Sequence, residues 1–138
     1  MKRAEQLVPL SREHHAALVL AKRIALCPDD QISRHAMCVH VSARFNLELA
    51  PHFEEEERWL LPALQAKHPD AVRRTLDDHR VMRELISRIA NSEVSALNEF
   101  GLLLAHHVRF EERELFPLFE SSLSVQLDAV TGLSSTTV

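Results

Sequence analysis

The sequence is poor in glycine, tyrosine and cysteine. Its 138 residues include two glycines, two cysteines and no tyrosine. So few glycines argue against an all-β domain, which needs many tight turns. The lack of tyrosine excludes a tyrosyl-radical mechanism. Cys27 and Cys38 do not form a CxxC motif, and we interpret them as reduced thiols rather than a zinc pair or a redox couple. This interpretation predicts a cytoplasmic protein.

Long hydrophobic runs and an excess of positive charge are also missing. The longest apolar run, residues 100–105, is far too short to span a bilayer, and no signal-peptide core follows the N-terminus. The formal net charge is -4, which gives no reason to expect binding to nucleic acid. We therefore expect a soluble protein without a membrane or nucleic-acid partner.

Helix-forming residues dominate what is present, chiefly Ala, Leu, Glu and Arg. Ser11 is a candidate N-cap for a first helix that ends before Pro28. Three further helices are expected at about 32–66, from the break at 68–70 to about 90, and at about 94–119. Together they predict an all-α, up-down-up-down four-helix bundle. We expect a single domain over 1–138, with the bundle at about 10–120 and a short C-terminal extension at 121–138.

A motif occurs twice in the chain. HFEEEERWLLP at 52–62 is followed by HVRFEERELFP at 107–117. The third and fourth predicted helices thus repeat the pattern of the first and second, which indicates two similar helical hairpins. Pro51 lies inside the second predicted helix and should kink it or mark an irregularity just before the first copy.

Helical spacing places one histidine of each helix on the apolar, inward face. In the second and fourth helices a glutamate follows that histidine by four residues, so both side chains share one face. The adjacent His15 and His106 fall on other faces. The polar residues predicted to face inward are His14, His52, Glu56, His79, His107 and Glu111.

Four histidines and two carboxylates are costly to bury without a compensating partner. A lone inward histidine is commonly a hydrogen-bonded core residue, but the repeated pattern favours a metal site. Six ligands exceed what one tetrahedral zinc ion takes, and they suit two ions bridged by the glutamates, with two histidines each. Nitrogen and oxygen ligands indicate iron, with manganese or zinc as substitutes. The ferritin-like Glu-x-x-His spacing is absent from these residues.

Four segments, EHHAAL, HFEEEERWLLP, DDHRVM and HHVRFEERELFP, resemble the hemerythrin-like, or HHE cation-binding, family. The resemblance covers about residues 10–117. It implies an up-down four-helix bundle around a non-haem di-iron site, with the ligands at the six positions named above. Family members are associated with the binding of oxygen, nitric oxide or iron.

One position departs from the family pattern. Oxygen-carrying hemerythrins have a further histidine four residues after the third-helix ligand, where this chain has Arg83. We expect one iron to lose a protein ligand, which argues against simple reversible oxygen carriage, and Arg83 to pair with a carboxylate or lie exposed. The residues considered as replacement ligands, all expected to lie around the site or on the surface instead, are His15, His106, Glu55, Glu112 and the more remote His40. Glu54 and Glu57 are interpreted as solvated charges.

The predicted function is the binding or sensing of O2 or NO, or iron handling, by a di-iron site. A di-iron oxidoreductase that turns over peroxide or NO is the alternative, and a helical interaction domain without metal is the remaining one. No catalytic residue is predicted beyond the metal site, and no feature of the sequence identifies a protein partner.

Overall fold

The computed structural model describes residues 2–123, and this part of the chain is helical and contains no strand. It forms four long helices, two of which include wider π-helical turns. The first helix consists of a 3-10 turn, Glu5–Leu7, and α1, Val8–Ala25. The second consists of α2, Gln31–Arg44, α3, Ala50–Glu55, and α4, Leu61–Leu64, joined by π-helical turns at Phe45–Leu49 and Glu56–Leu60. The third is α5, Pro69–Ala90, and the fourth is α6, Ala96–Phe110, with a π-helical turn at Glu111–Leu115 and a helical continuation to 123.

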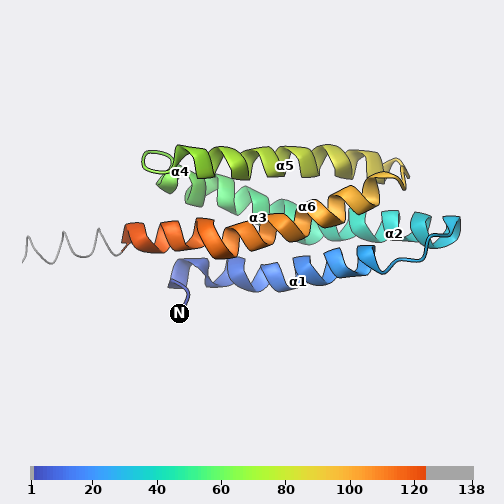
Figure 1. Ribbon diagram of the computed structural model, residues 1–138, viewed down its shortest axis with the longest axis horizontal. Coiled ribbons are helices and arrows are strands. Elements are labelled where there is room, and N and C mark those ends of the chain that lie inside the picture. Colours follow the sequence, from blue (N-terminus) through green and yellow to red (C-terminus); the bar gives the residue numbers. More distant parts are fainter. Residues whose placement is uncertain (1, 124–138) are drawn as a thin grey trace, which may run out of the picture.

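The four helices lie side by side as a bundle (Figure 1). The connection from α1 to α2 and the connection from α5 to α6 lie at one end of the molecule, and the connection from α4 to α5 lies at the other. The first helix packs on the fourth, and the third packs on both the second and the fourth. The expected C-terminal extension falls mainly on 124–138, outside the described residues.

The ends of the helices follow known capping chemistry, with one correction. Asp30 caps α2, because its Oδ1 accepts the backbone N–H of Ser33 at 2.8 Å. Ser92, with a φ of 67°, ends α5 in the left-handed conformation. The expectation that Ser11 caps the first helix is wrong. The helix starts at Val8, with Pro9 in its first turn, where a missing N–H costs nothing, so Ser11 lies inside it.

The π-helical turns keep the buried residues of the second helix on one side of it. Buried residues of the second helix recur every four positions at Val41, Phe45 and Leu49, and again at Glu56, Leu60 and Leu64. An α-helix repeats every 3.6 residues, so this spacing would drift around its surface. The wider π turns absorb the extra residues. The irregularity expected near Pro51 is confirmed as the π turn that ends at Leu49.

Helical spacing also predicts Ala63 and Leu76 on the inward faces of their helices, and the structure contradicts both predictions. Ala63 is exposed, because the π turn at Glu56–Leu60 advances the helix and brings Leu64 inward instead. On α5, Leu76 is 44% exposed, and its neighbour Thr75 is buried. Thr75 tolerates burial because its hydroxyl donates to the carbonyl of Ala71 at 2.9 Å.

The apolar interior consists of two separate clusters along the bundle. One contains residues such as Ile24, Phe45, Met82 and Phe100, nearer the α1–α2 connection. The other lies nearer the α4–α5 connection, and its members are Leu7, Leu10, Leu60, Leu61, Leu64, Val72, Phe110, Leu115, Phe116 and Phe119. Apart from Arg34 near the start of α2, the buried polar residues lie where one cluster gives way to the other. No helix among residues 2–123 has the length and hydropathy needed to cross a membrane.

Candidate metal centre

All six side chains predicted to face inward are buried, and they converge between the two apolar clusters. None is more than 3% exposed. His14 comes from α1, His52 from α3, His79 from α5 and His107 from α6. Glu56 and Glu111 are each the first residue of a π-helical turn. The two copies of the sequence motif therefore present histidine and glutamate in the same local geometry.

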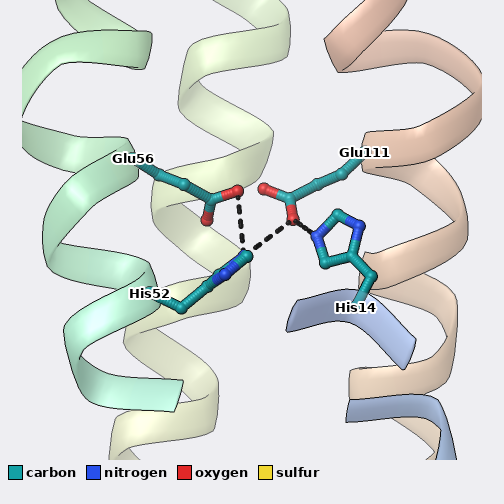
Figure 2. Close-up of side chains that lie close together, drawn as sticks. All are labelled: His14, His52, Glu56 and Glu111. Carbon is teal, nitrogen blue, oxygen red and sulfur yellow. Dashed lines mark hydrogen bonds and ion pairs between the residues drawn. The ribbon is translucent and has the colours of Figure 1, made fainter. Parts of the chain in front are cut away.

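One half of the cluster joins His14 and His52 to both glutamates (Figure 2). His14 Nε2 lies 2.7 Å from Glu111 Oε1, and His52 Nε2 lies 3.7 Å from the same oxygen. His52 Nε2 also lies 3.3 Å from Glu56 Oε2. The ligand atoms of these four residues all lie within 4.8 Å of one another, which is compact enough to surround one cation.

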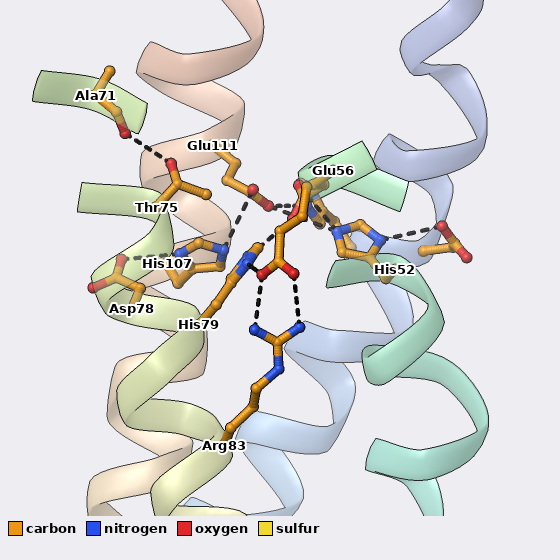
Figure 3. A network of polar contacts seen from close by, with 12 residues as sticks. His52, Glu56, Ala71, Thr75, Asp78, His79, Arg83, His107 and Glu111 are labelled. Carbon is orange, nitrogen blue, oxygen red and sulfur yellow. Dashed lines mark hydrogen bonds and ion pairs between the residues drawn. The ribbon is translucent and has the colours of Figure 1, made fainter. Parts of the chain in front are cut away.

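The other half joins His79 and His107 to the same two glutamates (Figure 3). His79 Nε2 lies 3.1 Å from Glu56 Oε1, and His107 Nε2 lies 3.3 Å from Glu111 Oε2. Both carboxylates thus belong to both groups of four, while each histidine belongs to one. This is the arrangement expected of two cations that share a pair of bridging carboxylates.

A second layer of carboxylates surrounds the histidines on the side away from the glutamates. His52 Nδ1 donates to Glu13 at 3.1 Å, His79 Nδ1 to Glu57 at 2.7 Å and His107 Nδ1 to Asp78 at 2.9 Å. His14 Nδ1 lies 3.2 Å from Glu112 Oε1 but is not aligned for a hydrogen bond. Such outer carboxylates fix the imidazole tautomer and turn Nε2 toward the cluster, as in many metal sites.

The sequence contains a signal for this outer layer that helical periodicity alone does not reveal. An acidic residue directly precedes His14 and His79, and another directly follows Glu56 and Glu111. Each serves a histidine of a different helix, so only the packed structure reveals the pairing. The expectation that Glu57 is a solvated charge is wrong, because Glu57 is half-buried between His79 and Arg83.

None of the residues considered as replacement ligands joins either group of four. His15 and His106 are exposed, as expected. Glu55 accepts hydrogen bonds from Arg58 and Trp59, and His40 contacts Arg23. Glu112 comes closest, at the outer side of His14. Arg83 pairs with Glu57, which confirms the expectation of a carboxylate partner near the site.

The electrostatics of the cluster favour a cation at its centre. Burial, and next the charge of Glu111, raises the pKa of Glu56. Burial opposes charge on His52, but contacts with Glu111, Glu13 and Glu56 outweigh it and raise its pKa to about 12. Likewise Glu111, Asp78 and Glu56 outweigh burial at His107 and raise its pKa to about 10. The carboxylates therefore attract positive charge strongly in this buried position.

Several buried ligand atoms have no hydrogen-bond partner. They include one oxygen of each central glutamate, Glu56 Oε2 and Glu111 Oε2, together with His107 Nε2. Unpartnered buried polar atoms are rare and costly in folded proteins. Imidazole nitrogen and carboxylate oxygen are a donor set that iron and similar cations take. The residues present therefore fit a bound metal pair.

A small cavity adjoins the cluster. It has a volume of about 10 Å³, and its apolar lining comes from Ala17, Leu49, Phe53, Leu104 and Val108. The titratable side chains around it are four cluster residues and Glu13. A space of this size holds about one water-sized molecule. A ligand that reaches the cluster from this cavity must therefore be very small.

Comparison with known proteins gives one family match. The model of the hemerythrin HHE cation binding domain matches residues 7–120, which is most of the chain. Neither the curated proteins nor the solved structures gave a match. The matched region contains all six central residues and all four outer carboxylates.

Proposed function

The chain belongs to the hemerythrin HHE cation-binding domain family, and on that premise we propose that its buried cluster holds two non-haem iron ions. His14 and His52 would hold one ion, and His79 and His107 the other. Glu56 and Glu111 would bridge the two ions. The observation that supports this most strongly is that both glutamates belong to both groups of four ligand atoms and keep one unpartnered oxygen each.

The donor set supports iron over other metals in this proposal. Six ligands of mixed nitrogen and oxygen type exceed the four of a structural zinc site, and they suit iron, with manganese as a chemical neighbour. When bound, iron supplies redox chemistry and a coordination position for a small ligand. The imidazoles and carboxylates set its geometry, and the apolar walls keep bulk water away.

We propose the binding or sensing of O2 or NO as the function, with iron handling as a related role. The 10 Å³ cavity supports a diatomic ligand, because a larger substrate has no room beside the cluster. Turnover of peroxide or NO by a di-iron oxidoreductase is the second candidate. We rank it lower because Glu13, the one titratable group at the cavity outside the cluster, is already paired with His52.

Two further proposals concern the topology of the bundle and the location of the protein. The alternation of the helix connections between the two ends of the molecule supports an up-down-up-down topology (Figure 1). The free thiols of Cys27 and Cys38 support a cytoplasmic location, where thiols stay reduced.

The proposal predicts a metal content that depends on the buried histidines. Protein from iron-supplied cells, purified without oxygen, should contain about two irons per chain by elemental analysis. His52→Ala should lower this content sharply, because His52 Nε2 faces both glutamates. His15→Ala, the matched control on an exposed neighbour of His14, should keep the wild-type content.

Ligand binding is tested on the same protein. The reduced form should change its optical spectrum when O2 or NO is added, and the His52→Ala variant should not. Equal metal loss in both histidine variants would contradict the assignment of ligands. An iron-loaded protein whose optical spectrum does not change with either gas would contradict the proposed function. Steady consumption of peroxide or NO would favour the oxidoreductase.

A further inference from the structure

Arg83 lies beside the buried cluster, and its side chain cannot bind a metal. It lies one helical turn after His79 on α5, so both side chains project from the same face of that helix. A guanidinium has no lone pair to give to a metal and stays positively charged. Arg83 therefore cannot act as a ligand, although it stands near ligands on a helix that supplies one.

The guanidinium instead binds Glu57 of the second helix with two parallel hydrogen bonds. Nη1 donates to Oε2 at 2.8 Å, and Nη2 donates to Oε1 at 3.0 Å. A two-point contact of this kind fixes the plane of the carboxylate as well as its position. It also ties α5 to the second helix beside the cluster.

The same carboxylate holds His79. Glu57 Oε2 accepts the Nδ1 hydrogen of His79 at 2.7 Å, the shortest of the four contacts between a histidine and an outer carboxylate. Phe53 stacks on the His79 ring with centroids 4.0 Å apart and an interplanar angle of 14°. His79 is thus held both at its edge and on its face, with Nε2 directed to Glu56.

The other three outer carboxylates lack this combination. Within residues 2–123, Glu13 and Asp78 form no ion pair with an arginine. Glu112 pairs with Arg3 at 3.2 Å and accepts from Ser11, but it is not aligned to accept from His14. Glu57 alone is fixed by an arginine and also bonded to its histidine, so the half of the site that contains His79 is built differently from the other half.

We propose that Arg83 is a positioning residue for His79, acting through Glu57. Arg83 holds the Glu57 carboxylate in place, and Glu57 fixes the imidazole with Nε2 toward the cation position shared with His107. The group of ligands that contains His79 and His107 is thus positioned by the Arg83–Glu57 pair rather than by an additional ligand. This inference rests on the proposed metal function, and it concerns one of the two ions selectively.

The test is a titration of metal-free protein with Co²⁺ alone, followed by its optical bands, which report coordination geometry as well as affinity. Wild type should bind two ions. Glu57→Gln should weaken one of them by roughly 10- to 100-fold, as expected for loss of an outer carboxylate. Arg83→Gln should weaken the same ion by roughly 3- to 10-fold, because Glu57 remains but is no longer held.

Two further variants separate positioning from general charge. The double variant Arg83→Gln/Glu57→Gln should match Glu57→Gln alone, because Arg83 acts through Glu57. Arg83→Lys keeps the charge but loses the two-point contact, and it should fall between wild type and Arg83→Gln. Arg80→Gln is the matched control, an exposed arginine of the same helix whose one ion pair within residues 2–123 is with Glu84.

The outcomes distinguish this inference from the proposed function. Wild type that binds no Co²⁺ would overturn both. Wild type that binds two ions, with Arg83→Gln indistinguishable from Arg80→Gln, would overturn the inference alone. If the loss of Co²⁺ affinity in the double variant equals the product of the two single losses, Arg83 acts independently of Glu57. If Arg83→Lys binds Co²⁺ as wild type does, the two-point contact is not needed. Either result would also overturn it.

Discussion

At the scale of single residues, neighbouring side chains of the same type have opposite environments. His14 and His107 are buried, whereas His15 and His106 next to them are exposed. One residue along an α-helix is a rotation of about 100°, which is enough to move a side chain from the cluster to solvent. The chemistry of the site is therefore decided by helical phase as much as by residue type.

Glu56 offers a residue-scale test of whether the cluster is built for metal or for stability. Its pKa is raised, first by burial and then by Glu111, which shifts the carboxyl group toward its neutral form when metal is absent. Gln has nearly the same shape and is neutral. Glu56→Gln should therefore change the free energy of unfolding of the metal-free protein by less than about 1 kcal/mol. It should remove most of the stabilisation that added metal gives.

The measurement is urea denaturation with and without Co²⁺, and Glu54→Gln serves as an exposed control in the same stretch. A Glu56→Gln variant that is several kcal/mol less stable without metal would indicate a structural role for the carboxylate. A variant that keeps the full metal-dependent stabilisation would remove Glu56 from the proposed ligands.

At the scale of helices, the close approach of α1 and α6 positions His14 beside the last helix. Gly101 permits this approach, since a Cβ at its position would lie 3.0 Å from Ile24 Cγ2 and 3.2 Å from Ile24 Cβ. A branched side chain at residue 101 would have to push the two helices apart. Both helices carry proposed ligands, so their separation matters for the site as well as for the core.

Gly101→Leu should therefore destabilise the protein. Overpacking costs roughly 1–3 kcal/mol, and the gain in helix propensity over glycine offsets at most about 1 kcal/mol of it. Thermal denaturation followed by circular dichroism measures the net effect. Ala16→Leu, at an exposed position of α1, is the control and should leave the melting temperature nearly unchanged. A stable Gly101→Leu variant would mean that Ile24 moves aside without cost.

At the scale of the whole molecule, the polar cluster interrupts the core. The two apolar clusters lie on either side of it, and the proposed ligands come from all four helices. A bound metal pair would therefore connect every helix at the point where apolar packing is weakest. Folding free energy should depend on metal, because the ligands are brought together only in the folded chain.

Removal of metal should accordingly lower the melting temperature of the whole protein. At a free metal concentration about 1,000 times Kd, one site contributes about 4 kcal/mol. For a domain of this size, this corresponds to a shift of roughly 15 °C for one site. Calorimetry before and after chelation measures it, with re-addition of Fe²⁺ under nitrogen as the control for reversibility. An unchanged melting temperature would argue that the six side chains hold no metal.

Much of the site was predictable from the sequence because it depends on local periodicity. Residues four apart on a helix share a face whatever the helix packs against, so His52 with Glu56 and His107 with Glu111 could be paired in advance. The apolar stripes around His14 and His79 likewise oriented those helices. The four helices and their breaks followed from composition and from helix-breaking residues such as Pro28, apart from the start of the first helix.

Other features depend on how the helices meet. The π-helical turns changed the inward register after Glu56, which placed Leu64 rather than Ala63 in the core. Glu57 belongs to a run of charges that periodicity assigns to the surface. Only the packing of α5 against the second helix places this carboxylate between Arg83 and His79.

The sequence by itself determined that the chain is helical and which six polar side chains face inward, because both follow from backbone repeat and side-chain character within one helix. Only the tertiary structure decided which carboxylate supports which histidine, how Arg83 is used and how little space adjoins the cluster. These are distances between helices, and the pitch of a single helix contains no information about its neighbours.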